Sequence, residues 1–226
     1  MKDGTLVRLS CPISSLNDAR EYLLSAARNK SVLNVGAAGG VDRYLPSYLD
    51  QWPHHAFAEV AREIEGIDID EEGIRHAAQH GTSITLANCE TCDLGRFYDV
   101  IVMSDVIEHV ASPTRAVTNL ARHLAPGGHL LITTPNGTSL NALRTTMLRR
   151  PPSVYYDHMQ IFYPEHIQAI CDRHRLTLEE VFLFTNHDQR TRGFRARSIV
   201  IRGVGLLLPR LSQSFLAVIR QKPHTS

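Results

Sequence analysis

The chain has 226 residues, which suits one α/β domain and is short for two. Its hydrophobic fraction of 43% can build a core, and its net charge of +1 excludes an overall electrostatic attraction to nucleic acid. The sequence contains no run of 18 apolar residues, so no membrane-spanning helix is predicted. The N-terminus lacks a signal-peptide pattern and the four cysteines suggest no disulfide scaffold, so we expect a reducing, cytoplasmic location.

The charge is distributed unevenly along the chain. Residues 1–143 carry 11 Lys/Arg and 17 Asp/Glu, a net charge of −6. Residues 144–226 carry 13 Lys/Arg and 6 Asp/Glu, a net charge of +7. This asymmetry indicates either two tasks within one fold or arginines that decorate surface helices.

Helix and strand patterns alternate along the chain. In chain order they predict a helix over 14–29, a strand over 31–35, a helix over 56–63, a strand over 65–69, a helix over 71–80, strands over 82–87 and 98–104, a helix over 113–124, a strand over 129–134, a helix over 164–173, and strands over 178–184 and 215–220. The alternation predicts one α/β domain over 1–226, with a mostly parallel sheet of seven strands covered by helices on both faces.

In such sheets ligands bind beyond the carboxyl ends of the strands, so the residues that follow each strand should carry the chemistry. The small residues at 36–40 follow the first strand and let the backbone approach a ligand, or they form a turn that simply needs small residues. Their spacing departs from a dinucleotide fingerprint. Asp68 ends the second strand and can accept hydrogen bonds from ribose hydroxyls or cap the next helix, for which Asp70 is another candidate.

Five motifs between residues 31 and 136 then point to a family. VLNVGAAGG, GIDID, ANCE, YDVIVMSDVIEHV and LAPGGHLLITTPN resemble the ordered motifs of class I S-adenosylmethionine-dependent methyltransferases, which have a Rossmann-like fold. The resemblance is greatest to small-molecule enzymes of ubiquinone biosynthesis and of polysaccharide and antibiotic pathways. It implies S-adenosyl-L-methionine as the cofactor, S-adenosyl-L-homocysteine as its product, and a small-molecule acceptor.

The resemblance also implies which residues hold the cofactor. They are Asn34, Gly36, Ala37, Ala38, Asp68, Ile69, Asn88, Cys89, Glu90, Ser104, Asp105 and Val106. Among them, the turn from Gly36 to Ala38 approaches the methionine part, Asp68 holds the ribose, and Ile69 packs against adenine. The backbone at Cys89 faces the adenine ring, and Ser104 and Asp105 lie beside the methionine amine and the sulfonium.

Two positions depart from the family pattern. Asn34 stands where the family usually has aspartate, and Ala38 where it usually has glycine. Asn34 keeps a hydrogen-bonding side chain but loses a negative charge near a cationic cofactor, and Asp105 can supply a carboxylate instead. We therefore expect a reduced cofactor affinity, and a non-catalytic cofactor-binding module of the same fold is an alternative to an enzyme.

Two histidines are candidates for the general base that an oxygen acceptor needs. His109 follows the fourth strand and, by the resemblance, borders the methyl group; its alternative role is to hydrogen-bond the backbone. His158 lies in a segment of about 136–163 that has no strong periodicity and is expected to cover the acceptor. Its alternative role is to pin that loop to the fold.

Neighbours of His158 are expected to contact the acceptor. They are Tyr155, Tyr156 and Asp157, with Arg144 as a cation for a phosphate or carboxylate. O-methylation of a small molecule in a biosynthetic pathway is the first expectation, because His109 and His158 offer bases. N-methylation of an amino sugar or a similar amine is the alternative.

Other polar residues are not expected to bind a metal. Cys89 and Cys92 have the spacing of a zinc or redox pair but lack two further ligands. His54 and His55 are expected on a surface turn without partners, and His166 is expected to be structural.

Residues 194–211 mix arginines with aliphatic residues. Such a basic amphipathic stretch can make peripheral contact with an anionic membrane, which suits an acidic or lipid-linked acceptor. Alternatively it packs on the sheet or on a second subunit of a homodimer. Nucleic acid is not expected as a substrate, because no RNA-binding module or aromatic platform accompanies the domain.

Overall fold

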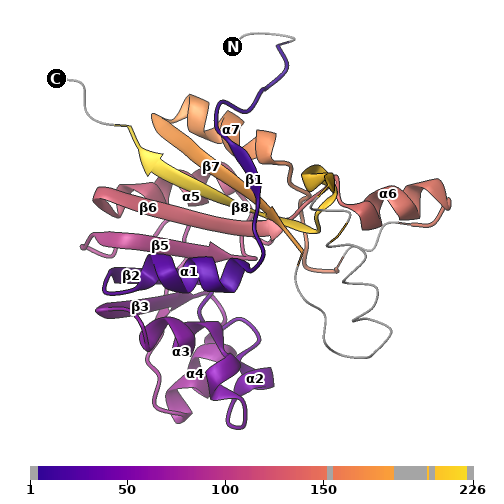
Figure 1. Cartoon of the computed structure of the whole chain (residues 1–226). Coiled ribbons are helices and arrows are strands. Elements are labelled where there is room, and N and C mark those ends of the chain that lie inside the picture. Colours follow the sequence, from indigo (N-terminus) through magenta and orange to yellow (C-terminus); the bar gives the residue numbers. More distant parts are fainter. Residues whose placement is uncertain (1–4, 152–154, 186–202, 204–206, 223–226) are drawn as a thin grey trace. The chain divides into compact units, whose positions relative to one another are not determined.

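The computed structural model describes residues 5–151, 155–185, 203 and 207–222 (Figure 1). Most of the stretch 194–211, expected to be basic and amphipathic, lies outside the described residues. In the part of the chain that is described, no helix is long and apolar enough to cross a membrane.

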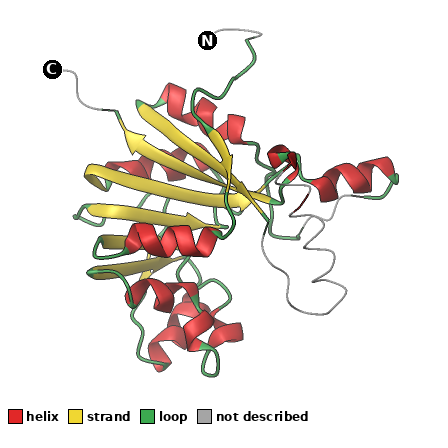
Figure 2. Cartoon of the chain, in the orientation of Figure 1, coloured by secondary structure: helices red, strands yellow, loops and turns green. Residues whose placement is uncertain are grey.

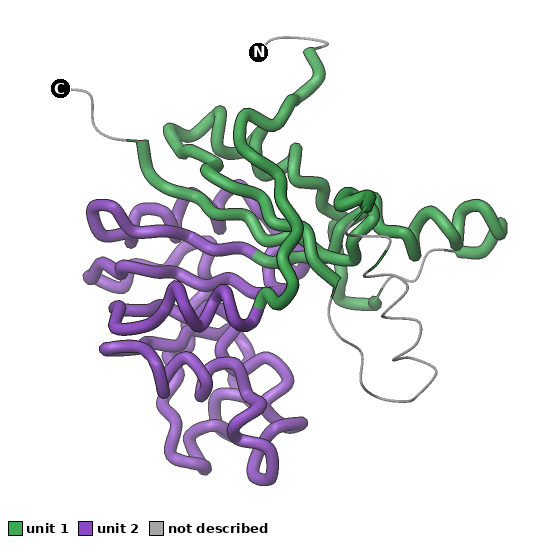
Figure 3. The backbone as a smooth tube through the Cα atoms, in the orientation of Figure 1, with its two compact units in different colours: residues 1–19, 133–226 green, residues 20–132 purple. Residues whose placement is uncertain are grey.

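The hydrogen-bonded strand order is β1-β7-β8-β6-β5-β2-β3-β4, and most neighbouring strands are parallel. This confirms the α/β fold with a mostly parallel sheet, although the described residues form eight strands where seven were expected. The chain divides into two compact units, residues 20–132 and residues 1–19 with 133–226 (Figure 3). Strand β6 (Leu124–Pro135) contributes residues to both units.

The unit of residues 20–132 contains strands that pair in parallel; Figure 2 colours the strands yellow and the helices red. Its strands are β2 (Ser31–Val35), β3 (Glu63–Asp68), β4 (Thr85–Leu86) and β5 (Tyr98–Ser104). Its helices are α1 (Ala19–Ala27, whose first residue belongs to the other unit), α2 (Val41–Tyr44), α3 (Pro53–Ala58), α4 (Glu71–Gln79) and α5 (Pro113–Arg122), with a 3-10 turn η1 at Leu49–Gln51. All five residues of β2 are buried, including the polar Ser31 and Asn34, which fits a strand covered on both faces.

Local signals predicted α4 and α5 well. The Asp70 side chain caps α4 by accepting a hydrogen bond from the Glu72 N–H at 3.1 Å. Ser112 caps α5 in the same way, and Pro113 occupies the first turn, where its missing N–H costs nothing. Of the two aspartates considered for the cap of α4, Asp70 has this role.

Two predicted helices were placed wrongly. The expected helix over 14–29 begins only at Ala19, because Ser14 and Ser15 pair with β7 as part of β1. The expected helix over 56–63 is displaced: α3 spans Pro53–Ala58, and the chain enters β3 at Glu63.

The other unit contains the antiparallel part of the sheet. Its strands are β1 (Ile13–Ser15), β7 (Leu176–Phe184) and β8 (Ser214–Gln221), and its helices are α6 (Leu140–Met147) and α7 (Pro164–Arg173), with a 3-10 turn η2 at Pro209–Leu211. β1 is parallel to β7, whereas β8 is antiparallel to it. The segment 136–163, which shows no strong periodicity in the sequence, nevertheless contains the helix α6. Ser139 caps α6 by accepting a hydrogen bond from the Ala142 N–H at 3.3 Å.

Candidate active site

A glycine-dependent turn links the ends of β2, β3 and β5. The N–H groups of Gly36 and Ala37 donate to the carbonyl oxygen of Ile67 at 2.9 and 3.1 Å. Gly36 has φ +76°, and a Cβ placed on it would lie 2.5 Å from Cγ2 of Val106. Only glycine therefore fits here, and the turn lies directly against the segment that follows β5.

Asp68 anchors the same turn from the end of β3. Its Oδ2 accepts from the Ala38 N–H at 2.8 Å, and its Oδ1 accepts from the N–H groups of Ile69 and Asp70 at 2.7 and 3.0 Å. An ionised carboxylate has about four lone-pair sites, so about one remains for a ribose hydroxyl. Ile69, the next residue, is 70% exposed and leaves an apolar side chain available to pack on an aromatic ring.

The departure at Ala38 has a packing reason. Ala37 and Ala38 are 1% exposed and belong to a core cluster that includes Trp52 and Ala77. A Cβ on Gly73, in α4, would lie 3.0 Å from the Ala38 Cβ. The Ala38 methyl group therefore fills space against α4, while the Ala38 N–H still faces Asp68.

The turn after β4 uses most of its polar groups internally. The Asn88 side chain accepts from the Glu90 N–H at 2.8 Å, and the Glu90 carboxylate accepts from the Ala111 N–H at 2.9 Å. The Asn119 side-chain amide donates to the carbonyl oxygens of Cys89 and Cys92 at 3.1 and 2.9 Å. The sequence analysis missed Asn119, since nothing in a helical pattern marks a side chain that reaches a distant turn.

The Cys89 thiol is poorly suited to metal or redox chemistry. Burial, with smaller contributions from Cys92 and Glu90, raises the pKa of Cys89 to about 12. Burial also raises the pKa of Cys92. The thiolate is the metal ligand and nucleophile, so these thiols stay in the unreactive form at neutral pH.

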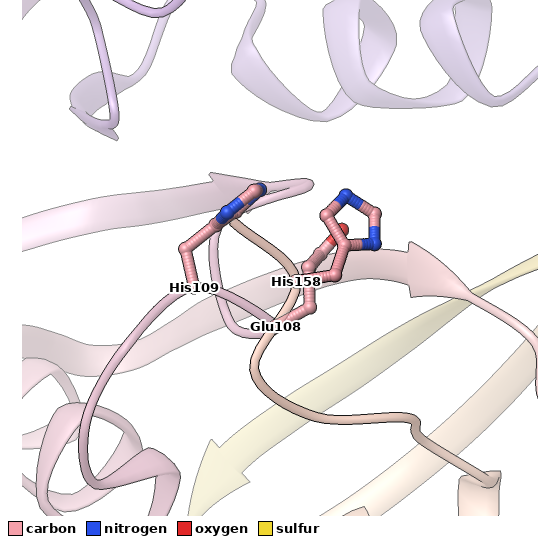
Figure 4. A group of neighbouring side chains, drawn as sticks. All are labelled: Glu108, His109 and His158. Carbon is pink, nitrogen blue, oxygen red and sulfur yellow. The ribbon is translucent and has the colours of Figure 1, made fainter. Parts of the chain in front are cut away.

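The segment after β5 carries the expected acidic and basic residues. Asp105 is exposed and has φ +52°, a left-handed conformation that aspartate tolerates better than most residues. The His109 N–H donates to the Val106 carbonyl oxygen at 2.9 Å, which closes the turn. Figure 4 shows Glu108 and His109 on this turn; Glu108 is buried at 1% exposure, whereas His109 is exposed.

The residues expected to contact the acceptor belong to the other unit. His158, also drawn in Figure 4, is half-buried; its N–H donates to the Tyr155 carbonyl oxygen at 3.1 Å, and the two rings lie 5.0 Å apart. Tyr156 and Asp157 are exposed. Arg144 is exposed on α6.

Two further polar contacts in this unit are short-range. Arg144 donates to the Asn141 side chain at 3.4 Å. The His166 side chain accepts from the Tyr163 N–H at 3.4 Å at the start of α7, which is a structural role.

The expectation for His54 was wrong. This histidine lies in α3 and is 4% exposed, not on a surface turn. Its Nδ1 is 3.2 Å from Nδ2 of Asn34, which is itself 5% exposed. The Trp52-Pro53 pair, which starts α3 with proline in its first turn, is the signal that could have placed His54 on a helix.

Comparison with known proteins identifies the family to which the chain belongs. A family model described as a methyltransferase domain matches residues 13–181. The ubiquinone biosynthesis O-methyltransferase of Vibrio vulnificus is 25% identical over an alignment of 179 positions, and the match covers 72% of this chain and 72% of the relative.

Solved structures share the fold. A SAM dependent methyltransferase from Archaeoglobus fulgidus has a TM-score of 0.57 at 16% identity and covers 89% of this chain and 90% of its own. The N-methyltransferase NodS from Bradyrhizobium japonicum, in complex with S-adenosyl-L-homocysteine, has a TM-score of 0.52 at 16% identity and covers 90% of this chain and 86% of its own.

The family match spans β1 to the middle of β7 and therefore includes the turn at Gly36, the carboxylate of Asp68 and the segment around Val106. At the ends of the parallel strands the structure has the bare backbone of Gly36 against Val106, the carboxylate of Asp68, and the exposed apolar side chain of Ile69. The chain belongs to the methyltransferase-domain family and is a class I S-adenosylmethionine-dependent methyltransferase.

Proposed function

We propose that this enzyme transfers the methyl group to a hydroxyl oxygen of a small molecule in a biosynthetic pathway. The observation that carries the proposal is His109, an exposed imidazole on the turn that begins beside the Gly36 loop at Val106. A hydroxyl of high pKa must lose its proton to become a good nucleophile, and imidazole is the usual proton acceptor near neutral pH. The Vibrio relative, named an O-methyltransferase, supports oxygen as the acceptor atom.

The residues of the site divide the work. When bound, S-adenosylmethionine supplies an electrophilic methyl group on its sulfonium. The backbone from Gly36 to Ala38 would lie along its methionine part, Asp68 would accept from its ribose, and Ile69 would cover its adenine. A ring nitrogen of His109 would take the acceptor's proton while the site keeps the reacting atoms in line.

The acceptor surface that we propose is the segment 136–163, of which residues 152–154 are not described. Large apolar side chains are exposed along it, at Leu143, Met147, Leu148, Met159 and Ile161. Arg144, Arg149 and Arg150 are exposed on the same segment. This combination suits an acceptor that joins an apolar part to an acidic group, such as a lipid-linked metabolite.

The test is an acceptor panel with matched pairs. Each pair carries the same aromatic ring and the same apolar chain, with a hydroxyl in one member and an amine in the other, and methyl transfer is followed as S-adenosylhomocysteine release. We expect turnover with the hydroxyl member, increasing when the apolar chain and an acidic group are present. Transfer to the amine alone would support N-methylation instead, and equal rates with and without the apolar chain would contradict the lipid-linked acceptor.

Asp68→Asn is expected to weaken cofactor binding by about 1–3 kcal/mol, or roughly 5- to 150-fold in Kd. In Asp68 both carboxylate oxygens accept hydrogen bonds, one from the Ala38 N–H and the other from the Ile69 N–H. In asparagine one of these atoms becomes an NH₂ donor, so a single oxygen cannot serve both N–H groups and a ribose hydroxyl. Titration calorimetry with S-adenosylhomocysteine measures the change. Glu59→Gln, which removes one negative charge from a 70% exposed side chain, is the matched control. An unchanged Kd in folded Asp68→Asn would rule out the ribose role.

A further inference from the structure

Three buried side chains from outside the glycine-rich turn Gly36–Ala38 pack beneath it, on the side of the protein core. Asn34, Trp52 and His54 form a buried group that we name the turn clamp, with exposed fractions of 5%, 1% and 4%. Trp52 and His54 come from the end of η1 and the start of α3, while Asn34 lies in β2. Their ring and amide groups are in mutual contact: the Trp52 and His54 rings lie 5.3 Å apart, and His54 contacts Asn34.

The clamp reaches the turn by one hydrogen bond and one packing contact. The Trp52 indole N–H donates to the Ala37 carbonyl oxygen at 3.1 Å. The His54 ring and the Ala37 methyl group both rest on the bare backbone of Gly66, since a Cβ there would lie 2.7 Å from His54 Cε1 and 2.8 Å from the Ala37 Cβ. Loss of the His54 ring would therefore open space beneath Ala37, at the centre of the turn.

The contact between Asn34 and His54 has a defined direction. Nδ2 of Asn34 is a donor only, so Nδ1 of His54 accepts, and the ring proton sits on Nε2. Burial, with a smaller contribution from His55, lowers the pKa of His54 to about 4, which keeps the ring neutral at physiological pH. Asn34 pairs with Gly66 across β2 and β3, so the amide, the ring and the glycine lie in one layer.

We propose that His54 is a positioning residue of the cofactor site. His54 holds Asn34 in a neutral hydrogen-bonded pair and, together with Trp52, fixes the position of the turn from Gly36 to Ala38. The pair occupies the place where the resemblance leads one to expect an aspartate, and it supports the turn by contact instead of by charge. The proposal rests on the methyltransferase assignment and is independent of the acceptor atom.

The first experiment compares cofactor binding by three His54 and Asn34 variants, measured by titration calorimetry with S-adenosylmethionine and S-adenosylhomocysteine in the absence of acceptor. We expect His54→Ala to raise both Kd values about tenfold, because it leaves the buried Asn34 amide without its acceptor and removes support from Ala37. Asn34→Ala should raise them similarly. The double variant should be no weaker than the worse single variant, since the interaction is already lost.

Rescue separates positioning from a general loss of stability. In His54→Asn the amide oxygen takes the place of Nδ1, so we expect most of the affinity to return even where the melting temperature stays below that of the wild type. His55→Ala, one residue along α3 at a side chain that pairs with exposed Glu59, is the matched control and should bind normally. Wild-type affinity in folded His54→Ala, or additive losses in the double variant, would overturn the proposal.

Trp52→Phe keeps the experiment decisive if His54→Ala does not fold. Phenylalanine retains most of the buried ring but lacks the N–H that holds the Ala37 carbonyl oxygen. We expect a severalfold rise in both Kd values, and unchanged affinity would contradict the clamp. Failure of the O-methylation proposal would leave all of these affinities unaffected, because no acceptor is present in the measurement.

Discussion

His109→Ala is expected to lower kcat on the hydroxylated acceptor about 10²–10⁴-fold while the Kd for S-adenosylmethionine stays within about twofold. The imidazole is exposed on the turn after β5, and the His109 backbone N–H donates to the Val106 carbonyl oxygen. Alanine keeps this backbone hydrogen bond, so the substitution should remove a proton acceptor while the proposed cofactor residues stay in place. Initial rates at saturating cofactor, with calorimetry on the same preparation, measure both quantities.

Two variants make this result specific. His109→Gln keeps a polar side chain but cannot take a proton, so it should be as slow as the alanine variant. His80→Ala, an exposed histidine at the end of α4, should be as active as the wild type. If His109→Ala keeps normal turnover and His158→Ala loses it by the same factor, the base is His158. Normal turnover in both would show that neither histidine is the base.

Gly36→Ala is expected to weaken S-adenosylhomocysteine binding by about 1–3 kcal/mol, or roughly 5- to 150-fold in Kd. The added Cβ would lie 2.5 Å from Cγ2 of Val106, and the residue would also have to keep φ +76°. Relief of the clash requires the turn or the Val106 side chain to move, and either movement disturbs the proposed cofactor site. Calorimetry and a thermal melt on the same variant measure the effect.

A second substitution separates the effect of the steric clash with Val106 from the effect of the backbone strain at residue 36. Val106→Ala in the Gly36→Ala background removes Cγ2, so part of the affinity should return while the cost of the positive φ remains. Gly95→Ala is the matched control: it also has positive φ, at +63°, but no atom lies within 4 Å of its added Cβ. That variant should lose some stability and keep its cofactor affinity. An equal loss of affinity in Gly95→Ala would contradict the steric explanation.

Local patterns were sufficient for much of the fold. The run Ser31–Val35 is mostly apolar and is followed by small residues, and it forms the buried strand β2 before the turn. Asp70 and Ser112 are polar residues just before helical patterns, and both cap helices. Such features depend on a few neighbouring residues, so they can be read along the chain.

Long-range pairing decided what these patterns could not. The sequence around Ser14 and Ser15 suits the start of a helix. Both residues nevertheless join a strand, because β7, more than 160 residues away along the chain, offers them backbone hydrogen-bond partners. The α6 helix lies where no periodicity was evident, and its Ser139 cap accounts for only one hydrogen bond. Local preferences are weak, and tertiary hydrogen bonds override them.

The sequence by itself determined the family, the order along the chain of the strands that precede the proposed cofactor residues, and the choice of Gly36 and Asp68 as candidates, because each depends on residue type at a fixed spacing. Only the tertiary structure decided that Val106 closes on Gly36 and that His54 is buried against Asn34. These contacts join residues from different elements, and their side chains carry no periodic signal. Packing in three dimensions, and not local preference, selects them.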